Sequence, residues 1–270
     1  MAELLLGKPV AEQIFEEIVQ CNCKMRLAAI GLDNPAWQQY VTALQKSGEK
    51  CNVAVENVNL QGKSPEDFCA TVRETSARRD VDGVILQQPL PKEYACALEY
   101  IHPEKDVDCI SELSVAKLYR GVNGFLPATP FAVLKLLDFY GIDLCGKNVV
   151  IVGRGNAVGK PLALLCLRRN ATVTVCHTKT QNLATVCKNA DIIVSACGVA
   201  GLITRDFVTE NSVVVDVGLS FVNGKTCGDV ADEVKNVAKA VSPVPGGVGP
   251  ITRAALFCNL LQAVRRQTNN

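Results

Sequence analysis

VVIVGRGNAVGKPLALL, residues 149–165, is the stretch that decides the fold class of this chain. Four apolar residues indicate a buried strand, Gly153, Gly155 and Gly159 follow in a turn, and the apolar residues after them indicate a helix. Glycines in such a turn let backbone amides approach a pyrophosphate at the N-terminus of the helix. The stretch therefore predicts a Rossmann-type dinucleotide site. A plain glycine turn between a strand and a helix is the alternative.

Strands and helices alternate on both sides of this stretch. Residues 171–177, 190–198 and 212–218 are apolar along most of their length and are expected to be buried parallel strands. Helices are expected at 127–141, with a first turn beginning at Pro130, and at 251–266. In the first half, helices are expected at 10–18 and 37–44, and strands at 27–30, 53–60 and 83–91. This alternation predicts an α/β fold, and 270 residues suffice for two domains.

The composition excludes several classes of function. The 28 Lys and Arg residues balance 27 Asp and Glu residues, so no charge pattern favours nucleic acid or an anionic membrane as a partner. No apolar run reaches the roughly 20 residues that a membrane helix requires. Residues 1–10 lack the pattern of a secretory signal, so we expect a cytoplasmic protein.

The 13 cysteines are dispersed and odd in number, and the chain has only two histidines, His102 and His177. Disulfide frameworks are typical of short secreted chains, and zinc sites of paired Cys-x-x-Cys motifs, and neither pattern occurs here. We therefore expect free thiols that fill the core in a reducing cytosol, and no metal site.

The segment after the glycine turn bears on which dinucleotide is bound. NAD sites usually place an acidic residue about 20 residues after the turn, where it accepts hydrogen bonds from the ribose. No Asp or Glu occurs between Gly153 and Thr180, whereas Arg154, Thr178 and Lys179 are basic or hydroxyl-bearing. Basic and hydroxyl-bearing side chains at the edge of the predicted site suit a 2′-phosphate and favour NADP over NAD. The alternative is that Arg154 and Lys179 are ordinary solvated loop charges.

Three features outside the dinucleotide site suggest a second ligand. Gln87 ends a predicted strand, where α/β sheets bind ligands, and Asp108 lies in a polar loop. Each alone would also fit a surface or turn residue. SPVPGGVGPIT, residues 242–252, combines prolines and glycines and predicts a loop of defined shape that a ligand can approach closely.

In this order, the motifs LQQPLP, PEKDVD, PATP, VGRGNAVGKP, CHTKT, VVDVGL and SPVPGGVGPIT resemble those of the methylenetetrahydrofolate dehydrogenase/methenyltetrahydrofolate cyclohydrolase family. These bifunctional enzymes serve one-carbon metabolism, and the resemblance covers essentially the whole chain. It implies a folate-binding catalytic α/β domain at 1–122 and a Rossmann-type NADP-binding domain at 123–250, with a cleft between them. It also implies that a helix at about 251–270 packs back on the first domain, and that the protein is a homodimer.

The resemblance further assigns roles to individual residues. The folate-stacking tyrosine corresponds to Tyr40, the pterin-binding aspartate to Asp108, and the glutamine that partners a catalytic lysine to Gln87. The remaining substrate contacts correspond to Pro245, Gly246 and Gly249. The cofactor contacts correspond to Gly153, Arg154, Gly155, Thr178, Leu219 and Thr252.

The chain differs from the family at the position of the catalytic lysine. Bifunctional members carry that lysine four residues after the tyrosine, where this chain has Leu44. Lys46 cannot replace it, because two further residues turn a helix by about 200°. Trp37 stands where the family often has serine, and it shares a helical face with Leu44. Lesser departures are Cys109 for a glycine and Ala128 for a cysteine.

The resemblance and its departure lead to one expectation and two alternatives. Hydride transfer to NADP depends mainly on positioning, whereas opening the methenyl ring needs proton transfer that leucine cannot supply. We therefore expect a methylenetetrahydrofolate dehydrogenase whose cyclohydrolase activity is weak or absent. The alternatives are a fully bifunctional enzyme with a substitute proton-transfer group, and a catalytically silent paralogue that binds folate or nucleotide.

Overall fold

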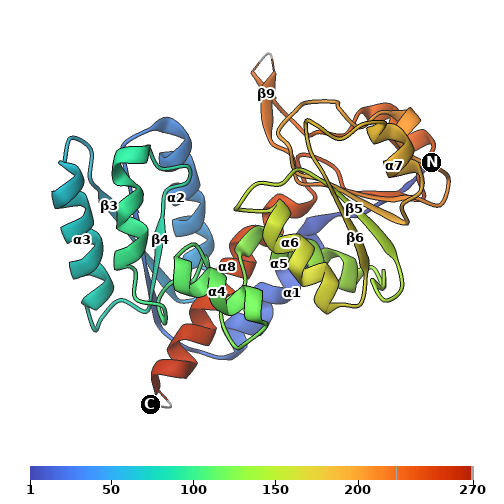
Figure 1. Ribbon diagram of the computed structural model, residues 1–270. Helices are drawn as coiled ribbons and strands as arrows, with labels where there is room; N and C mark the ends of the chain where they lie inside the picture. The colour runs from blue at the N-terminus through green and yellow to red at the C-terminus, as the bar shows by residue number, and fades with distance from the viewer. Residues whose placement is uncertain (223, 269–270) are drawn as a thin grey trace. The chain divides into compact units, whose positions relative to one another are not determined.

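The computed structural model describes residues 1–222 and 224–268, which form two compact units (Figure 1). Unit 1 comprises Met1–Glu12 and Thr129–Thr252, and unit 2 comprises Gln13–Ala128 and Arg253–Asn270. The division falls within three helices, α1 (Gly7–Gln20), α5 (Ala128–Phe139) and α8 (Val248–Thr268). The two-domain α/β architecture is confirmed, whereas the functional boundaries at 122/123 and 250/251 stay a prediction.

Unit 1 contains a parallel six-stranded sheet with the order β1-β11-β8-β7-β5-β6. The strands are β1 (Glu3–Leu4), β5 (Asn148–Val152), β6 (Thr172–Cys176), β7 (Ile192–Ser195), β8 (Val213–Asp216) and β11 (Ala240–Val241). Around them lie α5, α6 (Gly159–Arg168), α7 (Leu183–Lys188), the 3₁₀ turns η2 (Arg205–Phe207) and η3 (Asp232–Asn236), and the strands β9 (Ser220–Val222) and β10 (Lys225–Cys227). The central strands are Val/Ile runs because a parallel sheet is covered on both faces.

The strand order of unit 1 creates a switch point at β5. Its chain neighbour β6 pairs on one side, while β7 and then β8 continue on the other. Because every pairing is parallel, the loops that follow β5, β6, β7, β8 and β11 leave from the same carboxyl edge of the sheet. Open α/β sheets bind ligands at such a point, so unit 1 offers a site there.

Three sequence expectations for this unit need correction. β6 was expected to be buried, but Thr172, Thr174 and Val175 are exposed because β6 is an edge strand. α5 begins at Ala128, not at Pro130, since the first turn of a helix tolerates a residue without an N–H group. α8 begins at Val248, three residues before its expected start.

Unit 2 contains a parallel three-stranded sheet with β2 (Met25–Gly31) between β3 (Val53–Asn59) and β4 (Gly83–Leu86). Its further elements are α2 (Pro35–Gly48), α3 (Pro65–Ala77), the 3₁₀ segment η1 (Lys92–Tyr100) and α4 (Glu112–Arg120), together with parts of α1 and α8. The strands and helices expected in this half are confirmed, except that β4 ends at Leu86 and not at residue 91, because the prolines at 89 and 91 cannot donate to a strand ladder. One core cluster joins Ala28 and Ile30 of β2 to Phe68 of α3 and Leu86 of β4.

Local capping fixes where the helices of unit 2 begin. The Asn34 side chain accepts a hydrogen bond from the Trp37 amide at 2.9 Å, and Pro35 occupies the first turn of α2. Ser64 and Ser111 cap α3 and α4 in the same way. A capping side chain satisfies one amide that the first helical turn leaves without a partner, which positions the face of α2 that carries Tyr40.

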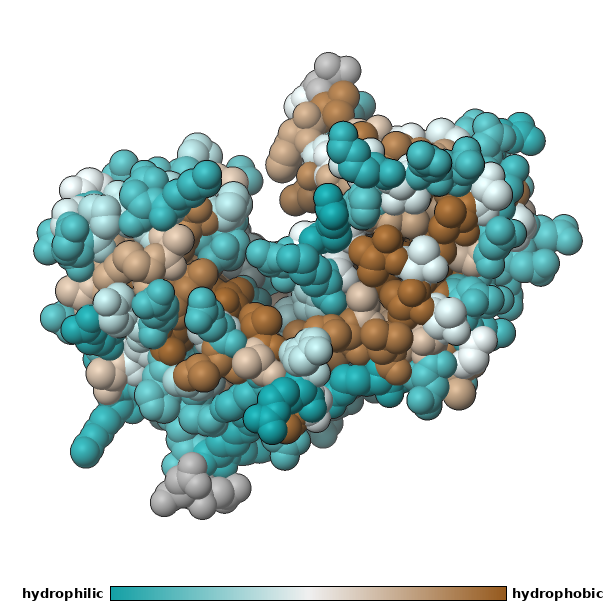
Figure 2. Space-filling view, in the orientation of Figure 1, coloured by the Kyte–Doolittle hydropathy of each residue, from teal (hydrophilic) through white to brown (hydrophobic). Residues whose placement is uncertain are grey.

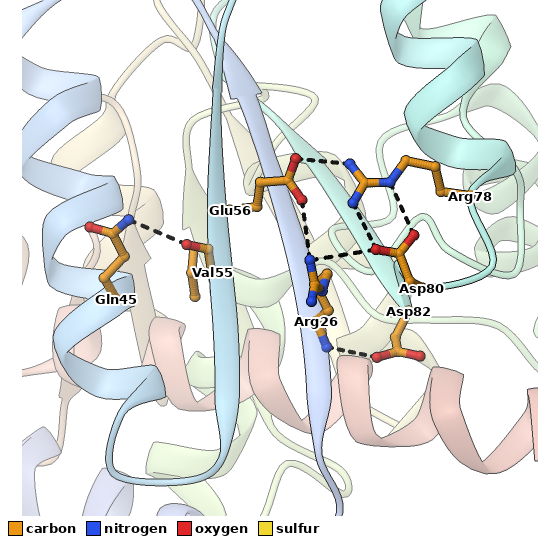
Figure 3. A network of polar contacts seen from close by, with 7 residues as sticks. All are labelled: Arg26, Gln45, Val55, Glu56, Arg78, Asp80 and Asp82. Atoms are coloured by element: carbon orange, nitrogen blue, oxygen red, sulfur yellow. Dashed lines mark hydrogen bonds and ion pairs between the residues drawn. The ribbon is translucent and has the colours of Figure 1, made fainter.

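A network of charged side chains lies near the amino end of β2 (Figure 3). The Arg78 guanidinium contacts Glu56 and Asp80, each at 2.8 Å, and Arg26 lies 3.5 Å from Asp80. The Arg26 amide also donates to Asp82 at 2.6 Å. These side chains are partly exposed, so each pair contributes at most about 1 kcal/mol. The network ties β2, β3 and α3 together away from the carboxyl end of β4.

Residues 1–222 and 224–268 contain no membrane-spanning helix, no metal-binding cluster and no disulfide bond. No helix there combines the length and apolar character needed to cross a bilayer. No group of three His, Cys, Asp or Glu side chains in that part is placed to hold a metal ion. All 13 cysteines, which lie within it, are free thiols. Six of them are buried, but Cys96 and Cys145 are exposed, so core packing accounts for only part of the cysteine content.

Candidate active site

The glycine turn after β5 has the geometry of a phosphate loop. Gly153 has φ of 125°, and a Cβ on it would lie 2.3 Å from the Ala196 carbonyl oxygen. A Cβ on Gly159 would lie 2.1 Å from the Gly153 carbonyl oxygen, so both positions require glycine. A Cβ on Gly155 would meet open space, which leaves its backbone accessible to a ligand.

The N-terminus of α6 completes this loop. Its N-cap residue, Val158, makes no side-chain capping bond, and the first turn contains no acidic residue. Pro161 in this turn has no N–H group, and the amides of Lys160 and Leu162 donate to the carbonyls of Gly155 and Val158. The feature that suits an anion is therefore the positive end of the helix dipole.

The rim of the loop is basic and exposed. Arg154 lies in the loop itself, and Thr178 follows β6, the neighbour of β5 in the sheet. The turn that carries Thr178 is held by a 2.9 Å hydrogen bond from the His177 amide to the Thr180 hydroxyl. The structure thus brings Gly153, Arg154, Gly155 and Thr178 to one edge of unit 1, and these residues fit a dinucleotide that carries a 2′-phosphate.

Two buried carboxylates brace the neighbouring loops, and sequence reasoning missed both. Asp229 accepts hydrogen bonds from the Ser195 hydroxyl at 2.9 Å and from the amides of Cys197 and Val199 at 2.9 and 2.8 Å. Asp216 accepts from the amides of Gly218, Asp229 and Val230 at 2.9–3.0 Å. These bonds fix the loops that follow β7 and β8. Burial raises the pKa of Asp216 to about 6 despite its three amide donors.

The other residues of unit 1 that were expected to contact the cofactor or the substrate lie in three segments. Leu219 is 62% exposed and precedes the β9–β10 hairpin, which projects as a largely apolar segment (Figure 2). In the loop after β11, Gly246 has φ of 112° and its carbonyl accepts from the Gly7 amide at 2.8 Å. Thr252 is half-buried on α8, where its hydroxyl donates to the Val248 carbonyl at 3.3 Å. Pro245 and Gly249 are exposed.

In unit 2, Gln87 lies directly after β4 and is 9% exposed. Its side-chain Oε1 accepts a hydrogen bond from the Leu32 backbone amide at 2.7 Å, and its backbone amide donates to the Ile30 carbonyl at 2.9 Å. Ile30 lies near the end of β2, and Leu32 directly follows that strand. The Gln87 side chain is therefore held at the carboxyl edge of the sheet, where sequence analysis placed it.

Tyr40 and Asp108 come together with a third residue, Arg253. Burial raises the pKa of Tyr40 well above its ordinary value, the Asp108 carboxylate raises it further, and the Arg253 guanidinium opposes this. Burial, followed by the charge on Asp106, raises the pKa of Asp108 to about 7, while a hydrogen bond from the Ala128 backbone lowers it. Unit 2 thus holds a half-buried carboxyl group that titrates near neutral pH beside a tyrosine.

Arg253 was not singled out from the sequence. It directly follows the SPVPGGVGPIT motif, which was the available signal. Its Nε atom is buried and has no hydrogen-bond partner among the described residues.

Comparison with known proteins identifies both halves of the chain. Residues 5–108 match the domain described as "Tetrahydrofolate dehydrogenase/cyclohydrolase, catalytic domain", and residues 127–268 match "Tetrahydrofolate dehydrogenase/cyclohydrolase, NAD(P)-binding domain". The chain belongs to the tetrahydrofolate dehydrogenase/cyclohydrolase family. The expected family is thereby confirmed.

Individual relatives cover nearly the whole chain. It is 45% identical to the bifunctional protein FolD of Nocardia farcinica, over 97% of both chains. The solved structure of the bifunctional enzyme FolD from Campylobacter jejuni has a TM-score of 0.95 and 37% identity, and covers 99% of this chain and 100% of that one. The Trypanosoma brucei dehydrogenase-cyclohydrolase (FolD), complexed with NADP cofactor and an inhibitor, has a TM-score of 0.93 and 32% identity, with coverage of 100% and 99%.

The position where the family resemblance expects a lysine is closed by apolar packing. Leu44 is 0% exposed and Trp37 is 6% exposed, and both lie on the buried face of α2. Lys46 is exposed, as its helical position requires. Within the part of the chain that the structure describes, the Trp37 indole Nε1 has no hydrogen-bond partner, and it packs against Gly31 beside Gln87 Oε1.

The two lesser departures from the family also lie beside Asp108. Cys109 is buried with φ of 55°, a conformation that glycine adopts more readily. Ala128 is buried and supplies the backbone hydrogen bond to the Asp108 carboxylate. Neither side chain introduces an ionisable group that could replace a lysine at neutral pH, because burial raises the pKa of Cys109 to about 12.

Proposed function

We propose that this protein oxidises 5,10-methylenetetrahydrofolate to 5,10-methenyltetrahydrofolate with NADP, as an oxidoreductase of one-carbon metabolism. The glycine loop from Gly153 to Gly159, with its basic rim at the switch point of a parallel sheet, carries the proposal. Family membership and the NADP complex of the Trypanosoma brucei relative support it. NADP, when bound, accepts the hydride that leaves the methylene carbon of the folate.

The residues of unit 1 would hold the dinucleotide. Backbone groups of Gly153 and Gly155 would contact the pyrophosphate, and Arg154 and Thr178 the 2′-phosphate. Leu219 would contribute a backbone contact, and Thr252 would lie by the nicotinamide. The substrate contacts assigned to Pro245, Gly246 and Gly249 belong to the same unit.

The residues of unit 2 would bind the pterin. Tyr40 presents a ring for stacking, and the Asp108 carboxylate can accept hydrogen bonds from pterin N–H groups. A ligand that donates to Asp108 favours its ionised form and would lower its pKa from about 7. Gln87 holds an amide at the adjacent strand end, where it can orient the substrate.

The cyclohydrolase step, which converts the methenyl compound to 10-formyltetrahydrofolate, would be weak or absent. Water must attack the ring and protons must move, and a general acid or base typically contributes about 10²–10⁴-fold to such a step. Leu44 supplies no proton, and Trp37 lies on the same buried face of α2. An indole N–H can donate a hydrogen bond but does not serve as an acid or base near neutral pH.

A second candidate is a fully bifunctional enzyme in which Asp108 replaces the lysine. The observation that favours it is the raised pKa of Asp108, about 7, because a general acid–base group works best when its pKa lies near the working pH. The hydrolysis of the methenyl compound would then follow the titration of Asp108, and Asp108→Asn would abolish it.

Two assays on the purified protein test these proposals. NADP and NAD are first supplied in parallel with methylenetetrahydrofolate, and formation of the reduced cofactor is followed. The loss of methenyltetrahydrofolate absorbance is then compared with the rate in buffer. NADP reduction with a methenyl rate near that of buffer supports the proposed activity. Rapid methenyl hydrolysis overturns the cyclohydrolase part, and no reduction of either cofactor indicates a silent paralogue.

The proposal includes a cytoplasmic homodimer, as the family resemblance implies. Light scattering after size exclusion measures the mass of the particle in solution, and a monomer would contradict the assembly. Fractionation of the source cells tests the location.

A further inference from the structure

Two cysteines of unit 2 lie with their sulfur atoms almost in bonding contact. Cys69 is on α3 and Cys96 is on η1, and their Sγ atoms are 2.7 Å apart. A disulfide bond has a sulfur–sulfur length of about 2.05 Å, so closing the pair requires a movement below about 1 Å. Cys69 is buried and Cys96 is exposed.

Contacts on both sides of the pair hold η1 against α3. The ring of Tyr94, two residues before Cys96, lies 4.9 Å from the ring of Phe68, the neighbour of Cys69. The Tyr94 hydroxyl donates to the Lys63 carbonyl at 3.1 Å. Further along, the Arg73 guanidinium lies 4.3 Å above the Tyr100 ring. The proximity of the two sulfurs therefore follows from the packing of two elements and does not depend on one flexible side chain.

We propose that Cys69 and Cys96 form an oxidation site, at which a low-molecular-weight disulfide such as glutathione disulfide converts the two thiols to an intramolecular disulfide. This inference does not depend on the reaction proposed above. It assigns a role to a pair of cysteines outside the catalytic geometry, of which Cys69 also packs in the core of unit 2.

The exposed thiol of Cys96 would react first, and the buried thiol of Cys69 second. The Cys96 thiolate attacks one sulfur of glutathione disulfide, forms a mixed disulfide and releases one glutathione thiolate, which takes up the proton. The Cys69 thiolate then attacks the Cys96 sulfur and releases the second glutathione. Two protein thiols are oxidised, one glutathione disulfide is reduced to two glutathione molecules, and atoms and electrons balance.

The second step is favoured by proximity rather than by acidity. Burial, and then the neighbouring Cys96, raise the pKa of Cys69 to about 11, so little Cys69 thiolate is present at neutral pH. An adjacent sulfur compensates for this, because an intramolecular reaction has a high effective concentration.

The disulfide would enclose a functional part of the chain. The loop from Cys69 to Cys96 contains β4 and Gln87. Closing it removes conformational freedom mainly from the unfolded chain, so oxidation should raise the thermal midpoint of the protein, and dithiothreitol should reverse the rise.

Peptide mapping gives a direct test, because trypsin leaves Cys69, Cys96 and Cys145 each as the one cysteine of its own peptide. Cys69 falls in residues 64–73, Cys96 in 93–105 and the exposed reference Cys145 in 136–147. The wild-type protein is equilibrated with graded ratios of glutathione disulfide to glutathione, alkylated, digested without reductant and analysed by mass spectrometry. We expect peptides 64–73 and 93–105 to be joined at a glutathione disulfide concentration roughly tenfold or more below that which modifies Cys145.

Matched variants complete the test. Cys96→Ser should remove both the cross-linked peptide and the oxidant-dependent rise of the thermal midpoint, whereas Cys145→Ser should leave both unchanged. The proposal is overturned if Cys96 accumulates only as a mixed disulfide with glutathione while Cys69 remains alkylatable. It is equally overturned if neither cysteine reacts before Cys145.

Discussion

The indole nitrogen of Trp37 lies 2.5 Å from the point that a Cβ on Gly31 would occupy. The end of β2 and the buried face of α2 therefore depend on each other, because only glycine at residue 31 leaves room for the indole. No residue among 1–222 and 224–268 accepts a hydrogen bond from the Trp37 Nε1–H. Two substitutions at Trp37 can therefore distinguish two contributions to stability. One is the cost of burying an N–H group without a partner, and the other is the gain from burying the apolar ring.

Trp37→Phe should leave the free energy of unfolding within about 1 kcal/mol of the wild type or raise it, because it removes a buried donor whose missing partner costs about 1–3 kcal/mol. Trp37→Ala should lower it by about 3–5 kcal/mol through lost packing. Urea unfolding of both variants measures the difference. Equal destabilisation by the two substitutions would show that the indole N–H contributes to stability.

Leu44→Lys should increase methenyl hydrolysis most when space is also made for the new side chain. We expect the double variant Trp37→Ser, Leu44→Lys to hydrolyse methenyltetrahydrofolate about 10²-fold or more faster than the wild type, because it gains a proton-transfer group. The single lysine variant should gain less. Leu44→Met, which keeps a similar side-chain volume without the amine, is the control. A comparable rise in the hydrolysis rate of that variant would contradict the role of the amine in proton transfer.

Asp108 should make folding stability depend on pH. Its pKa is about 7 in the folded protein, above the ordinary aspartate value of 3.8, so the folded state binds more protons than the unfolded state between these values. Stability from this group is fully present below about pH 4 and is lost as the pH rises to about 7. The wild type minus Asp108→Asn difference in unfolding free energy, measured by urea at several pH values, should show this slope. Asp33→Asn, at an exposed position, should not change it.

Asp229→Ala should destabilise unit 1 by about 3 kcal/mol or more, because several buried donors lose their acceptor together. The loop after β7 should also lose its fixed shape, and NADP affinity should fall. Chemical unfolding and cofactor titration measure the two effects. Asp206→Ala, at an exposed position, is the control and should leave both measurements near wild type.

Arg154→Ala should discriminate between the two dinucleotides. A guanidinium that pairs with a 2′-phosphate contributes to NADP binding alone, so we expect NADP affinity to fall by about tenfold or more and NAD affinity to change little. Equilibrium titration with each dinucleotide measures this, with Arg168→Ala on the exposed end of α6 as the control. An equal loss for both dinucleotides would place Arg154 at the shared pyrophosphate.

The sequence by itself determined the features that depend on neighbouring residues. Apolar runs marked β2, β5, β7 and β8, and capping residues such as Asn34 and Ser64 lie where helices begin. The glycine turn after β5 was visible because its requirement for small residues is local. Helical periodicity also placed Trp37 and Leu44 on one face, and their shared burial confirms it.

Only the tertiary structure decided which distant residues meet. Strand order made β6 an edge strand, so its side chains are exposed despite an apolar-looking sequence. Folding also brought Arg253 to Tyr40, Asp229 to the loop after β7, and Cys96 to Cys69. Periodicity and turn chemistry are encoded in adjacent residues, whereas these contacts depend on the order of strands and the packing of helices across the chain.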